Sequence, residues 1–195
     1  MVRTPSPKKR ETFLNSALRL FVARGAQNTS TAEIAKAAGT AAGTLFLYFP
    51  TKQDLIDELV LKIGKEQSEY IKSLLSPALP VRETFFTIWE GSLRWFLDNP
   101  DAYQFNQQIR DTNLVSEAVV QRSALFLDYY FITVQRGLEA GLIKPYPIEM
   151  IGGLLYQNLV GMMNLLRAQP DAEQQAALIR MGFDIFWDGI KSQKQ

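Results

Sequence analysis

Apolar residues recur along nearly the whole chain at the spacing of amphipathic helices. In the first such segment, Phe13, Ala17, Leu20 and Phe21 fall at positions i, i+4, i+7 and i+8, on one helix face. No segment alternates apolar and polar residues as a strand does, and glycine and proline fall between the periodic segments. The pattern predicts an all-α fold of nine helices, which span or begin at residues 7–24, 30–38, 41–48, 52–75, 81–98, 99–100, 114–140, 147 and 170–190.

Two short helices are expected close together between residues 30 and 49. Ser30 and Glu33 have the S-x-x-E spacing of a capping box, so the first helix begins there. Gly39 ends it, a second short helix follows almost at once, and Pro50 ends that one before Thr51 caps the next. Two short helices joined by a tight glycine turn, with an earlier helix packed across them, are the layout of a helix-turn-helix.

The composition of the chain changes after the helix expected at residues 52–75. Prolines at positions 77 and 80 precede segments that are rich in aromatic residues. The change predicts a helix-turn-helix DNA-binding domain in residues 1–52, a connecting helix in residues 52–75, and a second helical domain in residues 76–195. Residues 114–140 are apolar on nearly all sides, so we expect this helix at the centre of the second domain.

The chain contains no cysteine and no histidine. The lack of cysteine excludes a disulfide scaffold and thiolate metal sites. The lack of histidine removes the commonest general base and the usual zinc ligand. We therefore expect neither an enzyme nor a protein with a metal or organic cofactor.

No apolar signal sequence follows the polar, basic N-terminus. The most apolar stretch, Pro147–Leu166, carries Glu149, Gln157, Asn158 and Asn164. These polar residues favour a buried helix over a membrane span. We expect a cytoplasmic protein with no membrane association.

The net charge of +1 conceals an asymmetry along the chain. Residues 1–52 hold eight basic and two acidic residues, a formal charge of +6, whereas the other 143 residues hold 13 basic and 18 acidic residues, a charge of −5. A basic end on an acidic body is typical of nucleic-acid binding at that end. The run Lys8-Lys9-Arg10 is either a solvated tail or a segment that follows phosphates or enters the adjacent minor groove.

The stretch Thr29–Leu55, with the residues that precede it, resembles the TetR family of bacterial repressors. The matching residues are Phe13, Ala17, Phe21, Gly25, Thr29, Ile34, Ala35, Ala38, Gly39, Gly43, Thr44, Leu45, Phe46, Tyr48, Phe49, Lys52 and Leu55. This motif covers about the first 55 residues, and beyond it the chain matches only in helix number and length. The resemblance implies a DNA-binding regulator with nine helices and identifies no ligand.

In a helix-turn-helix, the second helix enters the major groove of double-stranded DNA. By resemblance, Ala42, Gly43 and Phe46 face the bases, whereas Leu45 and Phe49 belong to the core. Alanine stands at position 41, where the family often has a capping serine, and at position 42, where it often has a polar or basic residue. The full set expected to contact the operator is Thr29, Ser30, Thr31, Lys36, Ala42, Gly43, Thr44, Phe46, Leu47, Tyr48 and Lys52.

The resemblance also implies a homodimer formed by the last two helices. Glycines at positions 152, 153 and 161 would let these helices approach closely, and apolar side chains would supply the surface. About half of the apolar set is expected to close the core of the single chain instead. The apolar candidates are Met162, Met181, Phe183, Phe186 and Trp187.

The aromatic residues beyond position 80 favour a pocket for a small apolar effector, such as an acyl chain or a flat molecule. Most of these residues are ordinary core, and only a few would line the pocket. Gln107 is an alternative polar group to Asn158. The expected lining is Trp89, Phe126, Tyr130, Asn158, Met162 and Met163.

Two other functions stay open on the sequence. A DNA-binding regulator without a small-molecule ligand would have a filled core in place of the pocket. A helical apolar-ligand carrier, or a helical enzyme, would carry the N-terminal motif only incidentally. The charge asymmetry and the missing histidine and cysteine count against the last two.

Overall fold

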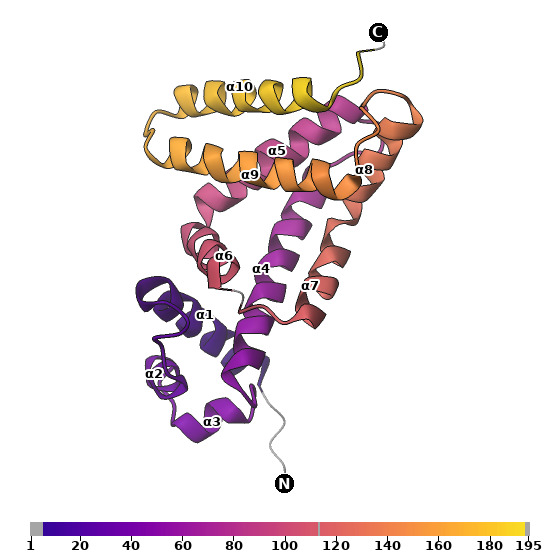
Figure 1. Cartoon of the computed structure of the whole chain (residues 1–195). Coiled ribbons are helices and arrows are strands. Elements are labelled where there is room, and N and C mark those ends of the chain that lie inside the picture. The colour runs from indigo at the N-terminus through magenta and orange to yellow at the C-terminus, as the bar shows by residue number, and fades with distance from the viewer. Residues whose placement is uncertain (1–5, 113, 194–195) are drawn as a thin grey trace. The chain divides into compact units, whose positions relative to one another are not determined.

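The computed structural model describes residues 6–112 and 114–193, and within these ranges all regular structure is helical. Nearly every helix lies where the sequence predicts it (Figure 1). The elements are α1 (Pro7–Arg24), α2 (Thr31–Ala37), α3 (Ala42–Phe46), α4 (Lys52–Leu74), α5 (Val81–Asp98), α6 (Pro100–Thr112), α7 (Glu117–Ala124), the 3₁₀ turn η1 (Leu125–Leu127), α8 (Asp128–Glu139), α9 (Ile148–Arg167) and α10 (Ala172–Ile190). The predicted all-α fold is confirmed.

The helix predicted at residues 114–140 is interrupted by η1, which separates α7 from α8. The hydroxyl of Ser68 on α4 donates a hydrogen bond of 2.7 Å to the carbonyl of Phe126. At the start of α8, Lys72 pairs with Asp128 at 2.7 Å. Both contacts join α4 to the residues at the interruption. The sequence around the interruption contains no pattern that predicts them.

The expectation that residues 114–140 form a central helix is wrong. Leu125, Phe131 and Ile132 are exposed, although Tyr129, Tyr130 and Val134 are buried. The segment is apolar on both faces, but only one face of α8 packs against the unit to which it belongs. Apolar content alone therefore overestimated its burial.

The described residues form two compact units, and the boundary between them differs from the sequence-based division. The first unit contains the residues up to Lys65 and residues 99–124, and the second contains residues 66–98 and those from Leu125 onward. Helix α6 belongs to the first unit because it packs on α1, where the rings of Phe105 and Phe21 stack with centroids 5.9 Å apart. Gln108 strengthens this contact by donating to the carbonyl of Val22 at 3.2 Å.

The segment before α7 is fastened to the beginning of α4 in the first unit. Asp57 accepts a hydrogen bond of 2.7 Å from the hydroxyl of Ser116, the residue that precedes α7. Gln53 donates to the carbonyl of Leu114 and to Asp57, each at 2.7 Å. Residues 99–124 thus belong to the same unit as the predicted DNA-binding helices. Among the described helices, only α4 has residues in both units.

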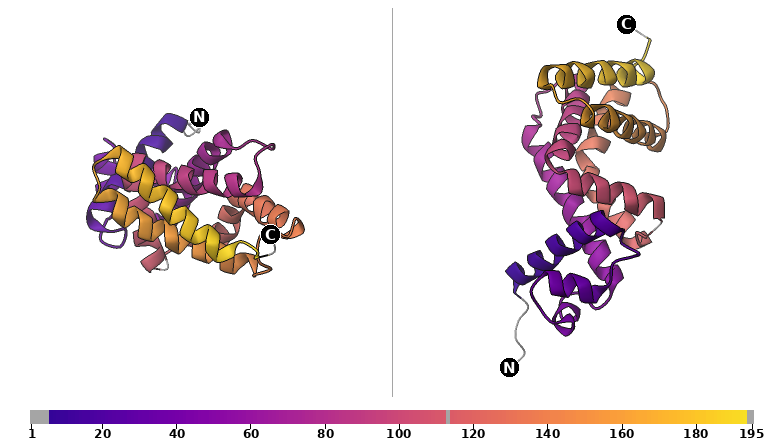
Figure 2. Two further views of the ribbon diagram at one scale, coloured as in Figure 1. Left: turned by 90° about the horizontal axis from the view of Figure 1, so that it is seen from above. Right: turned by 90° about the vertical axis from the view of Figure 1, so that its left-hand side faces the viewer.

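The second unit is built on α5, α8, α9 and α10. Helices α9 and α10 form an antiparallel hairpin (Figures 1 and 2), and both pack on α5. The end of α10 is tied to the segment after α8, because Lys144 donates from its backbone to Ile190 at 2.7 Å and Ser192 donates to Leu142 at 2.9 Å. Within the described ranges, no helix combines the length and apolar character needed to cross a membrane.

Candidate DNA-binding surface

The N-terminus of α2 is held by the capping box that the sequence predicts. The hydroxyl of Ser30 accepts from the backbone N–H of Glu33 at 3.2 Å, and Glu33 accepts from the backbone N–H of Ser30 at 2.8 Å. Arg24 at the end of α1 adds an ion pair to Glu33 at 2.9 Å. These contacts give α2 a defined orientation relative to α1.

The capping box makes stability dependent on pH. The hydrogen bonds from Ser30, and then the charge of Arg24, hold the pKa of Glu33 below its usual value of 4.5. A lowered pKa in the folded chain means that the stabilisation is complete above the unfolded pKa and is lost as pH falls through the folded pKa. We expect the difference in unfolding free energy between the wild type and Glu33→Gln to shrink between about pH 6 and pH 3.

Urea titrations of both proteins at several pH values measure this difference. Glutamine keeps an acceptor for the Ser30 N–H, so the comparison isolates the charge. A difference that stays constant across this pH range would mean that the carboxylate charge contributes nothing to the cap.

A tight turn connects α2 to α3. Gly39 has φ of +69°, a conformation that side chains with a Cβ rarely adopt. Thr40 then returns to α2, where its backbone N–H donates to the carbonyl of Ala35 at 2.9 Å and its hydroxyl contacts the same oxygen at 3.3 Å. Thr40 therefore does not cap α3, and the N-cap residue Ala41 has no side chain that could do so.

Helix α3 is anchored by its buried residues. Leu45 and Phe49 are buried as predicted, and the ring of Phe13 on α1 lies 6.5 Å from that of Phe49. Phe13 also packs against Tyr48, with ring centroids 5.4 Å apart, and the hydroxyl of Tyr48 accepts a hydrogen bond from the backbone of Ser6 at 2.9 Å. The core contacts leave the opposite face of α3 free.

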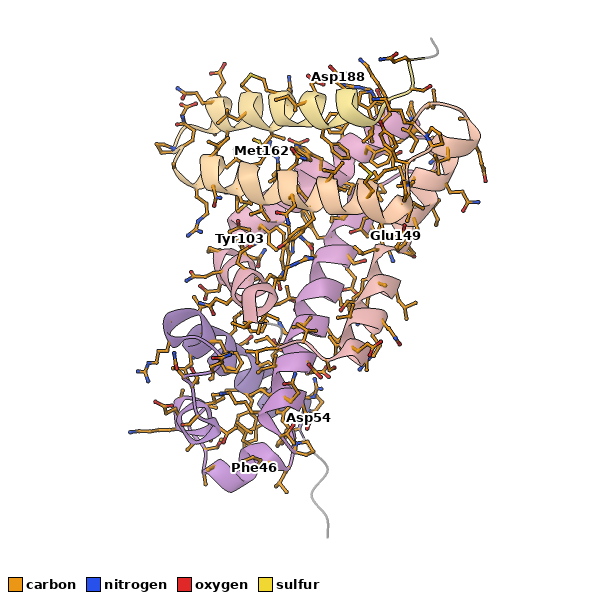
Figure 3. The ribbon with its side chains drawn as sticks, in the orientation of Figure 1. Phe46, Asp54, Tyr103, Glu149, Met162 and Asp188 are labelled. Atoms are coloured by element: carbon orange, nitrogen blue, oxygen red, sulfur yellow. The ribbon has the colours of Figure 1, made fainter. Side chains whose placement is uncertain are left out.

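That free face of α3 is small and apolar. Ala42 and Gly43 are exposed, and a Cβ added at Gly43 would have no atom within 4 Å. Phe46 is 45% exposed and Leu47 is 73% exposed; Figure 3 labels Phe46 on α3. Among residues 6–112 and 114–193, none requires glycine at position 43 or covers these two apolar side chains.

The remaining predicted contact residues are placed differently. Lys36 is exposed, and Thr31 and Thr44 are half-buried. Thr29 is only 1% exposed, and its hydroxyl donates to the carbonyl of Gly25 at 2.9 Å. Its side chain is therefore part of the packing between α1 and α2 and is not on the surface that the other candidates share.

Lys52 makes a contact that the sequence did not predict. Its Nζ donates a hydrogen bond of 3.3 Å to the carbonyl of Gln27, in the turn between α1 and α2. The first residue of α4 thus reaches across to that turn. No local signal could have revealed this pair, because 25 positions separate the two residues.

The same unit contains an open groove of about 740 Å³. None of the residues predicted to line the effector pocket is among its lining residues. Its lining is Thr12, Asn15, Ser16, Leu18, Arg19, Ala37, Ala38, Gly39 and Asp101.

The second unit brings two of the predicted effector residues together in its core. Trp89 is fully buried, donates from Nε1 to the carbonyl of Ile179 at 2.9 Å, and stacks on Phe186. A Cβ at Gly182 would lie 2.6 Å from Sδ of Met162 and 3.1 Å from Cζ2 of Trp89. Met162 lies between α9 and α10 (Figure 3), so this part of the core is closely packed.

The other predicted effector residues are less closely associated. Tyr130 is buried, donates to the carbonyl of Ile148 at 3.1 Å, and has a pKa raised by burial and then by Glu149. Met163 is buried, whereas Phe126 and Asn158 are half-buried. The amide of Asn158 donates to Leu154 within its own helix.

An exposed apolar face runs along α9 and α10. Ile185 is 72% exposed, and nothing lies within 4 Å of a Cβ added at Gly153, Gly161 or Gly189. Of the residues predicted for a dimer, Met181 is on this face, whereas Met162, Phe183, Phe186 and Trp187 are buried in the single chain. The large exposed apolar residues of the two helices are Met150, Leu154, Leu165, Met181 and Ile185.

Most of this face was not predicted from the sequence, because apolar residues were identified without assigning the side of the helix on which each one lies. Met181 and Ile185 are four positions apart, as are Met150 and Leu154. This spacing places the two residues of each pair on one face of their helix. A comparison of that face with the face of the predicted core residues could have identified both pairs as exposed.

Comparisons with known proteins agree with this arrangement. Residues 13–59 match the profile of bacterial regulatory proteins of the tetR family. The chain is 27% identical over 146 residues to the HTH-type transcriptional regulator YhgD of Bacillus subtilis, which covers 73% of this chain and 75% of that protein. It is 23% identical over 196 residues to the HTH-type transcriptional regulator SrpR of Pseudomonas putida, covering 91% and 83% of the two chains.

The fold is shared with solved structures over almost the whole chain. A tetR family protein from Shewanella sp. PV-4 superposes with a TM-score of 0.88 and 28% identity. The superposition covers 95% of this chain and 99% of that one. The likeness therefore includes the helices beyond residue 59, which the family profile does not reach.

Proposed function

The chain belongs to the tetR family of bacterial regulatory proteins, and we propose that it represses transcription by binding a palindromic operator as a dimer in the cytoplasm. Like its relatives, it is a DNA-binding transcription regulator and not an enzyme. The observation that carries the proposal is the free face of α3, where Gly43, Phe46 and Leu47 are exposed while Leu45 and Phe49 are buried.

The chemistry of that face indicates how the operator would be read. Ala42 and Gly43 offer no side chain that could form paired hydrogen bonds with a base edge. Their small size lets the helix backbone approach the groove, and Phe46 and Leu47 suit contacts with thymine methyl groups. We infer that sequence preference comes from these apolar contacts and from DNA shape more than from polar readout.

The exposed face of α9 and α10 supports a dimer. Met181 and Ile185 on α10, with Met150 and Leu154 on α9, would be buried by a second copy. The open positions at Gly153 and Gly161 would let the helices of the two copies approach closely. A two-fold dimer would present two α3 helices to half-sites separated by one DNA turn, about 34–36 Å, or a multiple of it.

We further propose that a small apolar effector weakens operator binding. Its site would lie among the buried aromatic and methionine residues of the second unit, including Trp89, Tyr130 and Met163. A pivot of α4, which continues from the first unit into the second, would carry the signal. The coupling between effector and operator would be about 1–3 kcal/mol.

One observation favours a second candidate, a regulator without a small-molecule ligand. Trp89 has its indole N–H satisfied by Ile179 and its ring stacked on Phe186, and Gly182 lies close to both Trp89 and Met162. An effector that entered there would have to displace well-packed side chains. The two candidates differ only in their response to apolar molecules.

Operator selection tests the DNA-binding proposal. Purified protein would select from random duplexes over several rounds, and fluorescence anisotropy would compare the recovered site with random DNA at two salt concentrations. We expect one palindromic site, bound at least about 1,000-fold more tightly than random DNA. Weak binding that is blind to sequence would overturn the operator proposal and favour a carrier of apolar ligands.

The effector proposal is tested on the same operator complex. Saturated fatty acids of increasing length and flat aromatic compounds would be titrated into it at equilibrium. We expect at least one compound to weaken operator binding by about 5- to 150-fold. If none changes operator affinity or the thermal unfolding midpoint, the regulator without a ligand is the correct candidate.

Substitution of Lys52 separates a phosphate contact from a positioning role. If Nζ contacts a phosphate, Lys52→Ala weakens binding to operator and random DNA by similar factors and lowers the salt slope by about 1 for each phosphate that is no longer neutralised. If its role is the bond to the Gln27 carbonyl, the salt slope stays constant and the unfolding free energy falls. We expect the first result, measured by anisotropy titrations across a salt series with urea titrations alongside.

A further inference from the structure

The fold divides the basic run at the start of α1 into two parts. Nη2 of Arg10 lies 2.9 Å from Oε1 of Glu58 on α4, and its guanidinium lies over the ring of Phe49, 5.2 Å from the centroid. Arg10 therefore fastens α1 to its neighbours. Lys8 and Lys9 are exposed, and their side chains form no hydrogen bond or ion pair with another described residue.

The acidic residues around this end of α1 pair with other cations and do not neutralise the charges of the two lysines. Glu58 pairs with Arg10, and Glu11 pairs with Lys62 at 3.1 Å. The first turn of α1 contains no acidic residue. Two cations at the positive end of a helix dipole destabilise the helix. The placement of Lys8 and Lys9 therefore has no benefit for α1 itself.

The lysines lie at the end of α1 that contacts α3. Ser6, which precedes α1, donates its backbone N–H to the hydroxyl of Tyr48, two residues after the end of α3. Lys9 is four residues before Phe13 and so shares its helix face, and the Phe13 ring packs against Tyr48. Both contacts place the lysine pair beside the helix that would enter the major groove.

We propose that Lys8 and Lys9 form a phosphate-contacting site that extends the DNA surface of α2 and α3. The occupant is the backbone of the same DNA duplex, because its phosphates flank the groove in which α3 would lie. The site rests on the proposed operator binding. Both lysines precede residue 13, where the match to the family profile begins.

The test is a salt series of anisotropy titrations with the full-length double variant Lys8→Gln/Lys9→Gln, on the selected operator and on random DNA. A dimer carries four of these lysines. If all four contact phosphates, the slope of log K against log salt falls in magnitude by about 3.6, or about 0.9 for each phosphate. We expect binding to both duplexes to weaken by similar factors, since phosphate contacts carry no sequence information. The thermal midpoint should stay constant or rise.

Arg19→Gln is the matched control. Arg19 is on the same helix, is exposed, and forms no ion pair with a described residue, but it lines the groove beside residues 37–39. We expect its slope to equal that of the wild type, and the conservative variant Lys8→Arg/Lys9→Arg to retain the wild-type slope. An equal fall per charge removed, about 1.8 for the two Arg19→Gln substitutions of a dimer, would overturn the site in favour of a diffuse charge effect.

The remaining outcomes separate the site from the function on which it rests. If the wild type selects an operator but Lys8→Gln/Lys9→Gln keeps the full salt slope, the lysine site is overturned and the operator proposal stands. If no operator is selected, the operator proposal fails, and the slope on random DNA still decides the role of the lysines. Displacement of DNA by inorganic phosphate more strongly than by chloride at equal ionic strength, in the wild type only, would identify a free-anion site and overturn the proposed occupant.

Discussion

Replacing Ile185 with glutamate is expected to convert the proposed dimer into a monomer and to weaken binding to the proposed operator by about 100-fold or more. Ile185 is 72% exposed in the single chain, so the variant should fold normally. In a two-fold interface the substitution occurs twice, and each carboxylate would lose its water without gaining a partner. Such burial costs several kcal/mol, and about 2.8 kcal/mol already corresponds to a factor of 100.

Sedimentation and anisotropy measurements on the same preparation check both parts of this result. Ile132→Glu is the control, because Ile132 is also apolar and exposed but lies on α8, a different helix from α9 and α10. We expect this control to remain a dimer with normal operator binding. A dimer that survives Ile185→Glu but not Ile132→Glu would move the interface to α8.

Gly43→Ala and Gly43→Leu are expected to stabilise α3 while weakening operator binding in the order of their size. Glycine inside a helix costs about 0.5–1 kcal/mol relative to alanine, and the space around Gly43 is open within the chain. The added atoms would instead meet the DNA, if α3 approaches the groove as closely as its sequence permits. We expect about 10-fold weaker binding for alanine and at least about 100-fold for leucine, since each factor of 10 is about 1.4 kcal/mol.

Two measurements on each variant distinguish a DNA clash from damage to the fold. Urea unfolding should show equal or greater stability than the wild type, and binding to random DNA should change much less than binding to the operator. If both variants bind the operator normally, α3 does not approach the DNA backbone closely at position 43. The proposal that Ala42 and Gly43 let the helix backbone approach the groove would then be wrong.

The two regions of the chain differ in how well local patterns predicted them. Around α2 and α4 the contacts are local: Ser30 meets Glu33, and Thr51 meets Asp54, three positions apart. Sequence spacing therefore sufficed to place these helix starts. Residues predicted for the effector pocket are joined by contacts between distant positions, such as the 90 residues between Trp89 and Ile179. Periodicity predicts that such residues are buried but does not identify their partners.

The sequence by itself determined the all-α class, the helix-turn-helix between residues 30 and 49, and the burial of Leu45 and Phe49. Helical periodicity, capping spacing and the φ requirement of Gly39 act over a few residues, so they can be read directly from the chain. The distribution of charge along the chain, which is also read directly from the sequence, identified the basic run in which Lys8 and Lys9 lie.

Only the tertiary structure decided which residues of each pattern remain available for binding. It paired Arg10 with Glu58 and left Lys8 and Lys9 exposed, it buried Thr29, and it directed Ile185 outward while Phe186 and Trp187 closed the core. It also interrupted the helix at η1, where the hydroxyl of Ser68 donates to the carbonyl of Phe126. The physical reason is common to all of these: exposure and pairing depend on neighbours that are brought close by folding and are distant in the chain.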